Sequence, residues 1–189
     1  MNNGFLENID KTWTLFLDRD GVINKRIIGG YVTSESEFDF VSGALESINY
    51  FTRIFGRIIV VTNQQGVGKG LMTEDQLSSV HDYMESQVLK NGGHIDAIYY
   101  CTHLAESENN CRKPSVKMAN LAKSYFDEID FKKSLMVGDS ISDLEFGINS
   151  GMKTVFITNN TLDKRAIAMA DLSASCLEDL KSKIELCIK

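Results

Sequence analysis

The architecture of this chain can be worked out from one segment, Leu15-Phe16-Leu17-Asp18-Arg19-Asp20-Gly21-Val22. An apolar run ends there abruptly at two aspartates, and a glycine follows them. Short apolar runs bounded by turn residues are typical of buried strands. Because alternate residues of a strand share a face, Asp18 and Asp20 are predicted to point toward one place at the strand's end. Two carboxylates that close repel each other unless a cation or a proton lies between them. The segment therefore predicts a charged site.

The length, composition and net charge of the chain indicate what kind of protein it is. Of the 189 residues, 43% are hydrophobic and 24% charged, as expected of one globular domain, residues 1–189, with a buried core. Residues 1–11 are mostly polar and are predicted to form a flexible N-terminus. The net charge of −6 argues against nucleic-acid or anionic-membrane partners, which select a basic surface. No apolar run is long enough to span a membrane and no signal peptide is visible, so we expect a cytoplasmic protein.

The four cysteines, Cys101, Cys111, Cys176 and Cys187, carry no secretory context. They predict reduced thiols or metal ligands and not disulfides. Cys176 and Cys187 lie in a helical pattern near the end of the chain, which favours a place in the core.

Strand-like apolar runs alternate with helical periodicity along the rest of the chain. Strands are predicted at 58–61, 95–100, 135–137 and 154–157, with a short sixth beginning at 171–172, and helices at 43–55, 73–90, 115–126, 141–150, 165–170 and 176–188. The alternation predicts an α/β fold, a three-layer sandwich of the Rossmann type with a central parallel sheet. No insertion is long enough for a separate cap domain, so the loops 21–40 and 101–114 must cover the site.

Polar residues follow four of these strands, namely Asp18 and Asp20, Thr62 and Asn63, Cys101, and Asp139. In such sheets ligands bind at the carboxyl ends of the strands, where these residues are expected to meet. A carboxylate nucleophile, a second carboxylate for proton transfer and a third for a divalent metal suit phosphoryl transfer. Mg²⁺ prefers such oxygen ligands. Lys113 and the Thr62 hydroxyl are suited to bind phosphate oxygens.

Four segments in this order resemble the motifs of the haloacid dehalogenase (HAD) superfamily of phosphatases: Asp18–Val22, Val61–Asn63, Arg112–Pro114 and Gly138–Asp143. More narrowly, Asp18–Asn24, Thr62–Gly66 and Tyr100–Pro114 are similar to a capless subgroup. That subgroup contains the D,D-heptose 1,7-bisphosphate 7-phosphatases and the histidinol-phosphate phosphatases.

The resemblance implies a role for each residue of the site. Asp18 is then the nucleophile that forms an aspartyl phosphate, and Asp20 the general acid/base. Asp18, the backbone carbonyl of Asp20, and Asp139 are implied to hold Mg²⁺, and Asp143 to orient its neighbours from behind. The implied substrate-binding residues are Asn24, Thr62, Asn63, Gln64, Arg112 and Lys113.

One departure from the subgroup concerns a zinc loop of pattern C-x-H followed by C-x-C. Cys101, His103 and Cys111 match three of its ligands, but Asn109 stands where the remaining cysteine is expected. Structural zinc sites use four nitrogen or sulfur ligands. We therefore predict that Zn²⁺ binds weakly or not at all, whereas Mg²⁺ is required.

Two small phosphorylated metabolites compete as the substrate. The flap after the nucleophile carries the basic residues Lys25 and Arg26, and at Gly30–Val32 it resembles the heptose phosphatases. The substrate of those enzymes carries a second phosphate, away from the one that is removed, which such cations are suited to bind. The short 101–114 loop resembles the histidinol-phosphate phosphatases instead. We favour the heptose bisphosphate, with Arg112 and Lys69 as further cations, and keep histidinol phosphate as the alternative. A nucleic-acid end-processing phosphatase and an inactive binding module are less favoured, and a monomer is expected.

Overall fold

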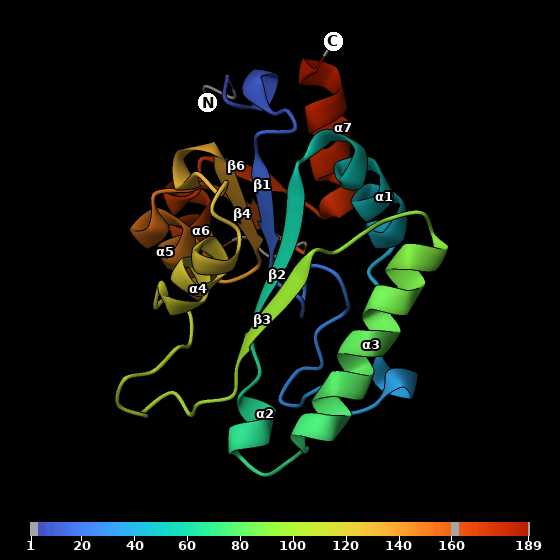
Figure 1. Ribbon diagram of the computed structural model, residues 1–189, viewed down its shortest axis with the longest axis vertical. Coiled ribbons are helices and arrows are strands. Elements are labelled where there is room, and N and C mark those ends of the chain that lie inside the picture. The colour runs from blue at the N-terminus through green and yellow to red at the C-terminus, as the bar shows by residue number, and fades with distance from the viewer. Residues whose placement is uncertain (1–3, 160–162, 189) are drawn as a thin grey trace.

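The computed structural model describes residues 4–159 and 163–188. Within them lies one sheet of six parallel strands in the order β3-β2-β1-β4-β5-β6 (Figure 1). The strands are β1 Thr14–Leu17, β2 Arg57–Asn63, β3 Ala97–Cys101, β4 Ser134–Gly138, β5 Lys153–Ile157 and β6 Leu172–Ala174. The prediction of an α/β fold with a central parallel sheet is confirmed.

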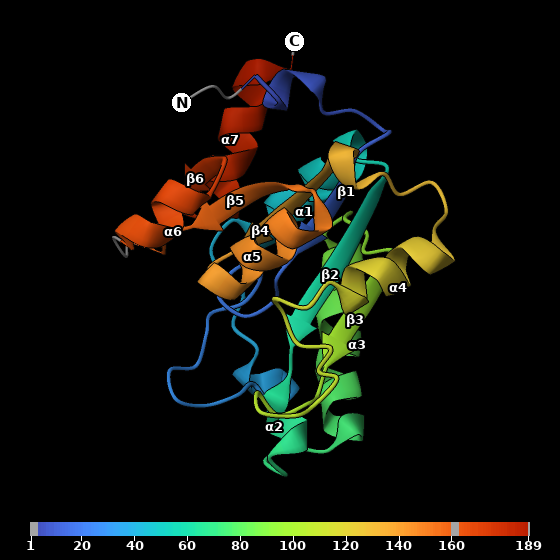
Figure 2. The same cartoon turned by 90° about the vertical axis from the view of Figure 1, so that its left-hand side faces the viewer.

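Helices cover both faces of this sheet. They are α1 Ala44–Ile54, α2 Gln65–Gly68, α3 Glu74–Lys90, α4 Lys117–Tyr125, α5 Ile141–Ser150, α6 Lys164–Met169 and α7 Leu177–Cys187. Helices α1, α3 and α7 lie on one face and α4, α5 and α6 on the other (Figures 1 and 2). The predicted three-layer sandwich is therefore observed. No helix of the described residues is both long and apolar enough to cross a membrane.

Strand β1 lies at the centre of the sheet and is buried on both sides. Leu15 and Leu17 pack into the apolar layer under α1, α3 and α7, whereas Phe16 packs against Ile59 and Met136 in the layer under α4 and α5. This alternation follows from the two-residue period of a strand. Each fully buried Leu or Phe contributes about 2 kcal/mol to stability. The packing fixes the end of β1, and with it the place of Asp18.

Capping residues set where two helices begin. Thr73 and Gln76 form the capping box predicted at the start of α3. Ser140 and Asp143 form a second one at the start of α5, where the Ser140 side chain accepts from the Asp143 backbone and the Asp143 carboxylate accepts from the Ser140 N–H. The second box holds Asp143 beside the carboxyl end of β4.

The predicted flexible N-terminus is wrong for residues 5–9. A short 3-10 helix, Leu6–Asn8, packs against α7, and Leu6 and Ile9 are buried. These two side chains find apolar partners in the layer that contains Leu177, Leu180 and Ile184. Residues 1–3 of that predicted segment lie outside the described part of the chain.

The loop 21–40 closes over the carboxyl edge of the sheet. Val22, Ile23, Val32 and Phe38 bury their side chains beneath it. An isolated bridge joins Asn24 to Phe40 and returns the chain to its starting point. The loop is therefore anchored at both ends, and its middle forms a wall of the cavity described next.

Candidate active site

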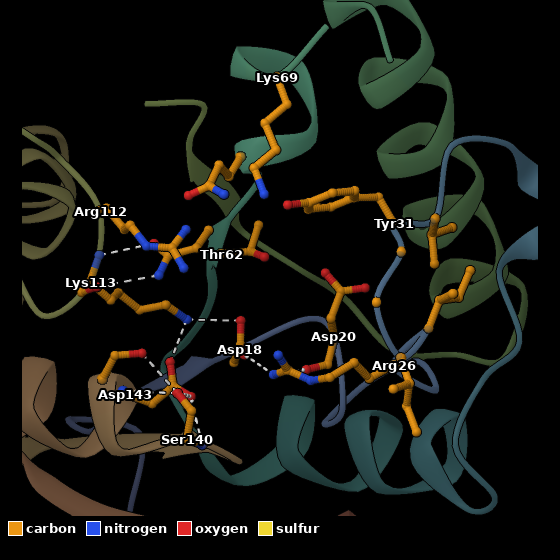
Figure 3. Close-up of a pocket in the computed structure, with 18 of the residues that line it drawn as sticks. Asp18, Asp20, Arg26, Tyr31, Thr62, Lys69, Arg112, Lys113, Ser140 and Asp143 are labelled. Carbon is orange, nitrogen blue, oxygen red and sulfur yellow. Dashed lines mark hydrogen bonds and ion pairs between the residues drawn. The ribbon is translucent and has the colours of Figure 1, made fainter. Parts of the chain in front are cut away.

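A cavity of about 560 Å³ opens at the carboxyl edge of the sheet (Figure 3). Five segments far apart in the sequence line it: the end of β1, the flap 26–32, the end of β2 with α2, residues 112–113 and the start of α5. The predicted site residues in its lining are Asp18, Asp20, Thr62, Asn63, Arg112, Lys113 and Asp143. The topology thus brings the predicted strand-end residues together.

Lys113 links two carboxylates at the base of the cavity. Its Nζ lies 2.8 Å from Asp18 Oδ1 and 2.6 Å from Asp143 Oδ1, and it donates to the Val61 carbonyl at 2.7 Å. Burial alone would lower the pKa of Lys113, but the charges of Asp143 and Asp18 outweigh it and raise the pKa. The ammonium therefore stays charged beside Asp18, where a phosphate oxygen could contact it.

The carboxyl group of Asp18 has a higher pKa than that of an exposed aspartate. Burial and the nearby Asp143 carboxylate raise the pKa of Asp18 to about 7, against the opposing charge of Lys113. Without a bound cation this carboxyl therefore holds a proton more readily than usual. A divalent cation at this point would favour the ionised form that a nucleophile requires.

Three carboxylates stand close enough to share such a cation. One oxygen each from Asp18, Asp139 and Asp143 lies within 4.8 Å of the others. Glycine at position 21 permits this, because its φ is 92° and a Cβ there would come within 1.9 Å of Asp139 Oδ2. Burial raises the pKa of Asp139 to about 6, while Arg26 opposes the shift and Asp143 adds to it.

The three predicted Mg²⁺ ligands converge on a cation that the chain itself supplies. Arg26 Nη2 lies 2.5 Å from Asp139 Oδ1. It lies 2.9 Å from the Asp20 carbonyl oxygen and 3.8 Å from Asp18 Oδ2 (Figure 3). These are hard oxygen atoms of the kind that Mg²⁺ takes. The donor set therefore fits Mg²⁺. Arg26, expected to meet a second phosphate of the substrate, instead contacts the three groups that are expected to hold the metal.

Asp20 turns its carboxylate away from this cluster. Its oxygens accept hydrogen bonds from Arg19 Nη2 at 3.0 Å, Asn24 Nδ2 at 2.9 Å and Gln64 Nε2 at 2.9 Å. Burial alone would raise the pKa of Asp20, but the charge of Arg19 and these hydrogen bonds outweigh it and lower the pKa. Asp20 is thus ionised in the free protein and held from three directions.

Asn24 and Gln64 are not placed where a substrate could touch them, contrary to the prediction. Both are fully buried and lie behind the cavity. The amide groups of both side chains bind Asp20, and that of Gln64 also donates to the Thr62 hydroxyl at 2.8 Å. The polar residues that follow β1 and β2 are therefore used partly to orient Asp20.

Thr62 and Asn63 end β2 beside the base of the cavity. The Thr62 oxygen accepts from Gln64, so its hydrogen is left to donate toward the cavity. The Asn63 side chain accepts from the Lys113 backbone N–H at 2.9 Å and donates to the Lys113 carbonyl at 3.3 Å. Asn63 therefore fixes the backbone of Lys113 in addition to lining the cavity.

The outer part of the cavity carries Arg112 and Lys69 (Figure 3). Neither side chain has an ion-pair partner among the residues at 4–159 and 163–188. The Lys69 ammonium lies 5.7 Å from the centre of the Tyr31 ring, which also lines the cavity. Two cationic side chains without acidic partners leave positive charge available to an anionic ligand.

The cysteine prediction is wrong for Cys101 and Cys111, which form a disulfide with a Cα–Cα distance of 5.7 Å. The loop between them folds back because Asn110 donates to the carbonyls of Leu104 and Ala105. His103 lies close to both sulfur atoms. Among the described residues, Cys176 and Cys187 are free and half-buried.

Sequence reasoning missed a buried arginine beside Asp20. Arg19, which stands between Asp18 and Asp20 in the sequence, is fully buried and binds both Asp20 and His81. From the sequence, His81 is predicted only to lie in a helix. A signal was available, because the residue between two strand-end aspartates points to the opposite side and must find a partner there.

Comparison with known proteins bears on the family and the fold of this chain. Residues 110–182 match the HAD-hydrolase-like family model. The chain is 40% identical to the D-glycero-alpha-D-manno-heptose-1,7-bisphosphate 7-phosphatase of Campylobacter jejuni, over 79% of this chain and 84% of that one. It is 33% identical to the D-glycero-beta-D-manno-heptose-1,7-bisphosphate 7-phosphatase of Vibrio cholerae, over 88% and 92%.

A solved structure extends the likeness to the fold. The D,D-heptose 1,7-bisphosphate phosphatase of B. bronchiseptica, crystallised with magnesium and phosphate, superposes with a TM-score of 0.82 at 26% identity, covering 92% of this chain and 98% of that one. Taken with the four sequence motifs and the acidic cluster, these relatives show that the chain belongs to the haloacid dehalogenase-like hydrolases, in the family of the heptose-1,7-bisphosphate 7-phosphatases.

Proposed function

We propose that this phosphatase removes the 7-phosphate of D-glycero-D-manno-heptose 1,7-bisphosphate. The observation that carries the proposal is the presence of two sets of cationic groups in one cavity. Lys113 lies at the base beside Asp18, and the unpaired Arg112 and Lys69 lie further out. A sugar with phosphates at both ends offers one anion to each set. The relatives named for this substrate support the assignment.

The first chemical step transfers the phosphoryl group to Asp18. A carboxylate oxygen of Asp18 attacks phosphorus, the bond to the sugar oxygen breaks, and an aspartyl phosphate forms. Lys113 and the Thr62 hydroxyl bind the phosphoryl oxygens, as their positions allow. Mg²⁺ held by Asp18, the Asp20 carbonyl and Asp139 would neutralise charge on the phosphoryl group.

Asp20 moves the protons of both steps. It protonates the sugar oxygen as that oxygen leaves, then takes a proton from the water that hydrolyses the aspartyl phosphate. Because the pKa of Asp20 is lowered in the free protein, the acid form requires the negative charge of the bound phosphate to raise it. The substrate thus helps to create the proton donor that it needs.

We further propose that the protein is a cytoplasmic monomer that acts on a small metabolite. We also propose that it has no nucleic-acid or membrane partner, because its net charge of −6 disfavours binding to anionic surfaces. The cytoplasm keeps thiols reduced, so Cys101 and Cys111 would there be free to act with His103 as zinc ligands. With Asn109 in place of a fourth ligand, we expect that zinc site to be weak.

A substrate panel tests the proposal. Both anomers of the heptose bisphosphate, heptose 7-phosphate and histidinol phosphate would be compared by phosphate release. The bisphosphate should give the highest kcat/KM, and Arg112→Ala should raise its KM about tenfold while changing the KM for heptose 7-phosphate little. Lys25→Ala, at an exposed residue paired with Asp39, is the matched control. Equal effects on both substrates, or faster hydrolysis of histidinol phosphate, would overturn the assignment.

A further inference from the structure

Arg19 is the largest fully buried side chain of the described residues. Its Nη2 contacts both carboxylate oxygens of Asp20, at 3.0 Å and 2.9 Å, and its Nη1 lies 3.2 Å from His81 Nε2. A guanidinium is costly to bury unless its charge and its donors are satisfied. Asp20 satisfies the charge and His81 accepts from Nη1, whereas Nε has no partner among the described residues.

His81 lies on α3, buried and behind the cavity. A guanidinium has donors only, so Nε2 of His81 must accept the hydrogen bond and the ring must be neutral, with its proton on Nδ1. Burial and the charge of Arg19 lower the pKa of His81 to about 3, which keeps the ring neutral at any working pH. The ring is therefore a permanent acceptor for Arg19.

We propose that His81 is a positioning residue for proton transfer: by accepting from Arg19 it fixes the guanidinium that orients the Asp20 carboxylate. The inference rests on the proposed role of Asp20 as general acid. Asn24 and Gln64 hold the same carboxylate from two other segments, but only Arg19 brings a charge. Without the acceptor, Nη1 would join Nε as a second buried donor without a partner, and this added cost favours rotation of the guanidinium toward another acceptor.

Substrates with different leaving groups distinguish a role in proton transfer from a purely structural role. A sugar alkoxide leaves slowly unless it is protonated, whereas the phenolate of p-nitrophenyl phosphate leaves without a proton. His81→Leu removes the acceptor and should lower kcat for the sugar phosphate about tenfold to hundredfold at nearly unchanged KM. Because Asp20 also acts as the base in hydrolysis of the aspartyl phosphate, p-nitrophenyl phosphate is followed by its pre-steady-state burst of phenolate, which reports formation of the aspartyl phosphate alone. The effect of His81→Leu on that burst rate should be less than about threefold.

Conservative and control variants separate positioning from folding. In His81→Gln the side-chain oxygen replaces Nε2 as acceptor, so the sugar-phosphate rate should recover most of the loss. His81→Asn keeps the polarity but is too short to reach Arg19 and should behave like His81→Leu, which keeps the test open if the leucine variant does not fold. Met84→Leu, at a buried position on the same helix, should change both substrates equally.

Three results would overturn the inference: equal losses on the two substrates, no recovery in His81→Gln, or a further loss when His81→Leu is added to Asp20→Asn. The Asp20→Asn variant alone separates this failure from failure of the proposed function. If Asp20 is the acid, that variant slows aspartyl-phosphate formation far more from the sugar phosphate than from p-nitrophenyl phosphate, as measured in a single turnover. If both single-turnover rates fall equally, the acid assignment itself is wrong.

Discussion

The Arg26 guanidinium lies on the Asp139 carboxylate, with Nη2 2.5 Å from Oδ1 and Nε 3.2 Å from Oδ2. The same Nη2 reaches the Asp20 carbonyl oxygen, so one flap residue contacts two of the three oxygen donors that we assign to Mg²⁺ at hydrogen-bonding distance. A guanidinium and a metal ion cannot both occupy that point. Arg26 must therefore move before Mg²⁺ binds, and the free energy of its ion pair opposes metal binding.

Arg26→Ala should consequently increase the affinity for Mg²⁺. Arg26 is half exposed, which limits the pair to about 1 kcal/mol, or a decrease of about fivefold in Kd. Isothermal titration calorimetry on the metal-free protein measures it directly. Lys25→Ala is the control, because Lys25 is the adjacent cation but pairs with Asp39 on the surface. An unchanged or larger Kd in Arg26→Ala would show that Arg26 does not compete with the metal.

Much of the fold follows from patterns that depend on neighbouring residues. The apolar run before Asp18 is buried on both faces, and the Thr73–Gln76 capping box begins α3 as predicted, because strand burial and capping are encoded within a few residues. The docking of Leu6 onto α7 is different. It depends on a surface formed by residues more than 160 positions away, which no local pattern contains.

The candidate site likewise has one part that the sequence pattern predicts and another that it does not. The carboxyl-edge rule places Asp18, Asp20 and Thr62 in one cavity, because parallel strands end at one edge. The rule does not say which polar residue faces the ligand and which faces another side chain. Gln64 lies within the same strand-end stretch as Thr62 yet binds Asp20, and that choice depends on side-chain directions that only the packed structure fixes.

Asp18→Asn should abolish turnover and stabilise the metal-free protein. The amide is a poor nucleophile, so the rate should fall below about a hundredth of the wild-type value. The variant also removes one of the three crowded carboxylates at the base of the cavity, so the melting temperature in EDTA should rise. Phosphate release and thermal denaturation measure the two effects.

Asp39→Asn is the control for this variant, since Asp39 is exposed and pairs only with Lys25 among the described residues. It should leave both quantities nearly unchanged. An Asp18→Asn protein that retains more than about a hundredth of the rate would contradict the nucleophile assignment, whatever its stability.

The Cys101–Cys111 loop should hold less than one equivalent of zinc after purification under reducing conditions. Asn109→Cys should raise the zinc content, because it supplies a thiolate where the family's loop has one. Asn109 has φ 52°, a left-handed conformation that costs a residue other than glycine, asparagine or aspartate about 1 kcal/mol. Asn109→Ala carries the same backbone cost without a thiol and is the matched control. Elemental analysis after dialysis measures the zinc content of each protein. A full equivalent of zinc in the unmodified protein would contradict the prediction.

The stability of the metal-free protein should fall as the pH rises from about 6.5 to about 8. Burial raises the pKa of Asp18 to about 7 from 3.8, so the folded state binds a proton here that the unfolded state has lost. This stabilisation is complete below pH 3.8 and is lost as the pH rises through about 7. Asp139, with a pKa raised to about 6, contributes in the same direction. His81 acts oppositely, because its unfolded form still binds part of a proton near its ordinary value of 6.5. Its contribution fades toward pH 8 and is smaller across this range than that of Asp18, whose folded-state pKa is higher.

Mg²⁺ should reverse this trend, because it binds the ionised carboxylates and competes with their protons. The increase in melting temperature on adding Mg²⁺ should therefore be larger at about pH 8 than at about pH 6.5. Thermal denaturation in EDTA and in excess Mg²⁺ at the two values measures both effects. In Asp18→Asn the fall with pH should be shallower, because its largest source is gone. A melting temperature in EDTA that rises across this range would mean that Asp18 is already ionised without a metal.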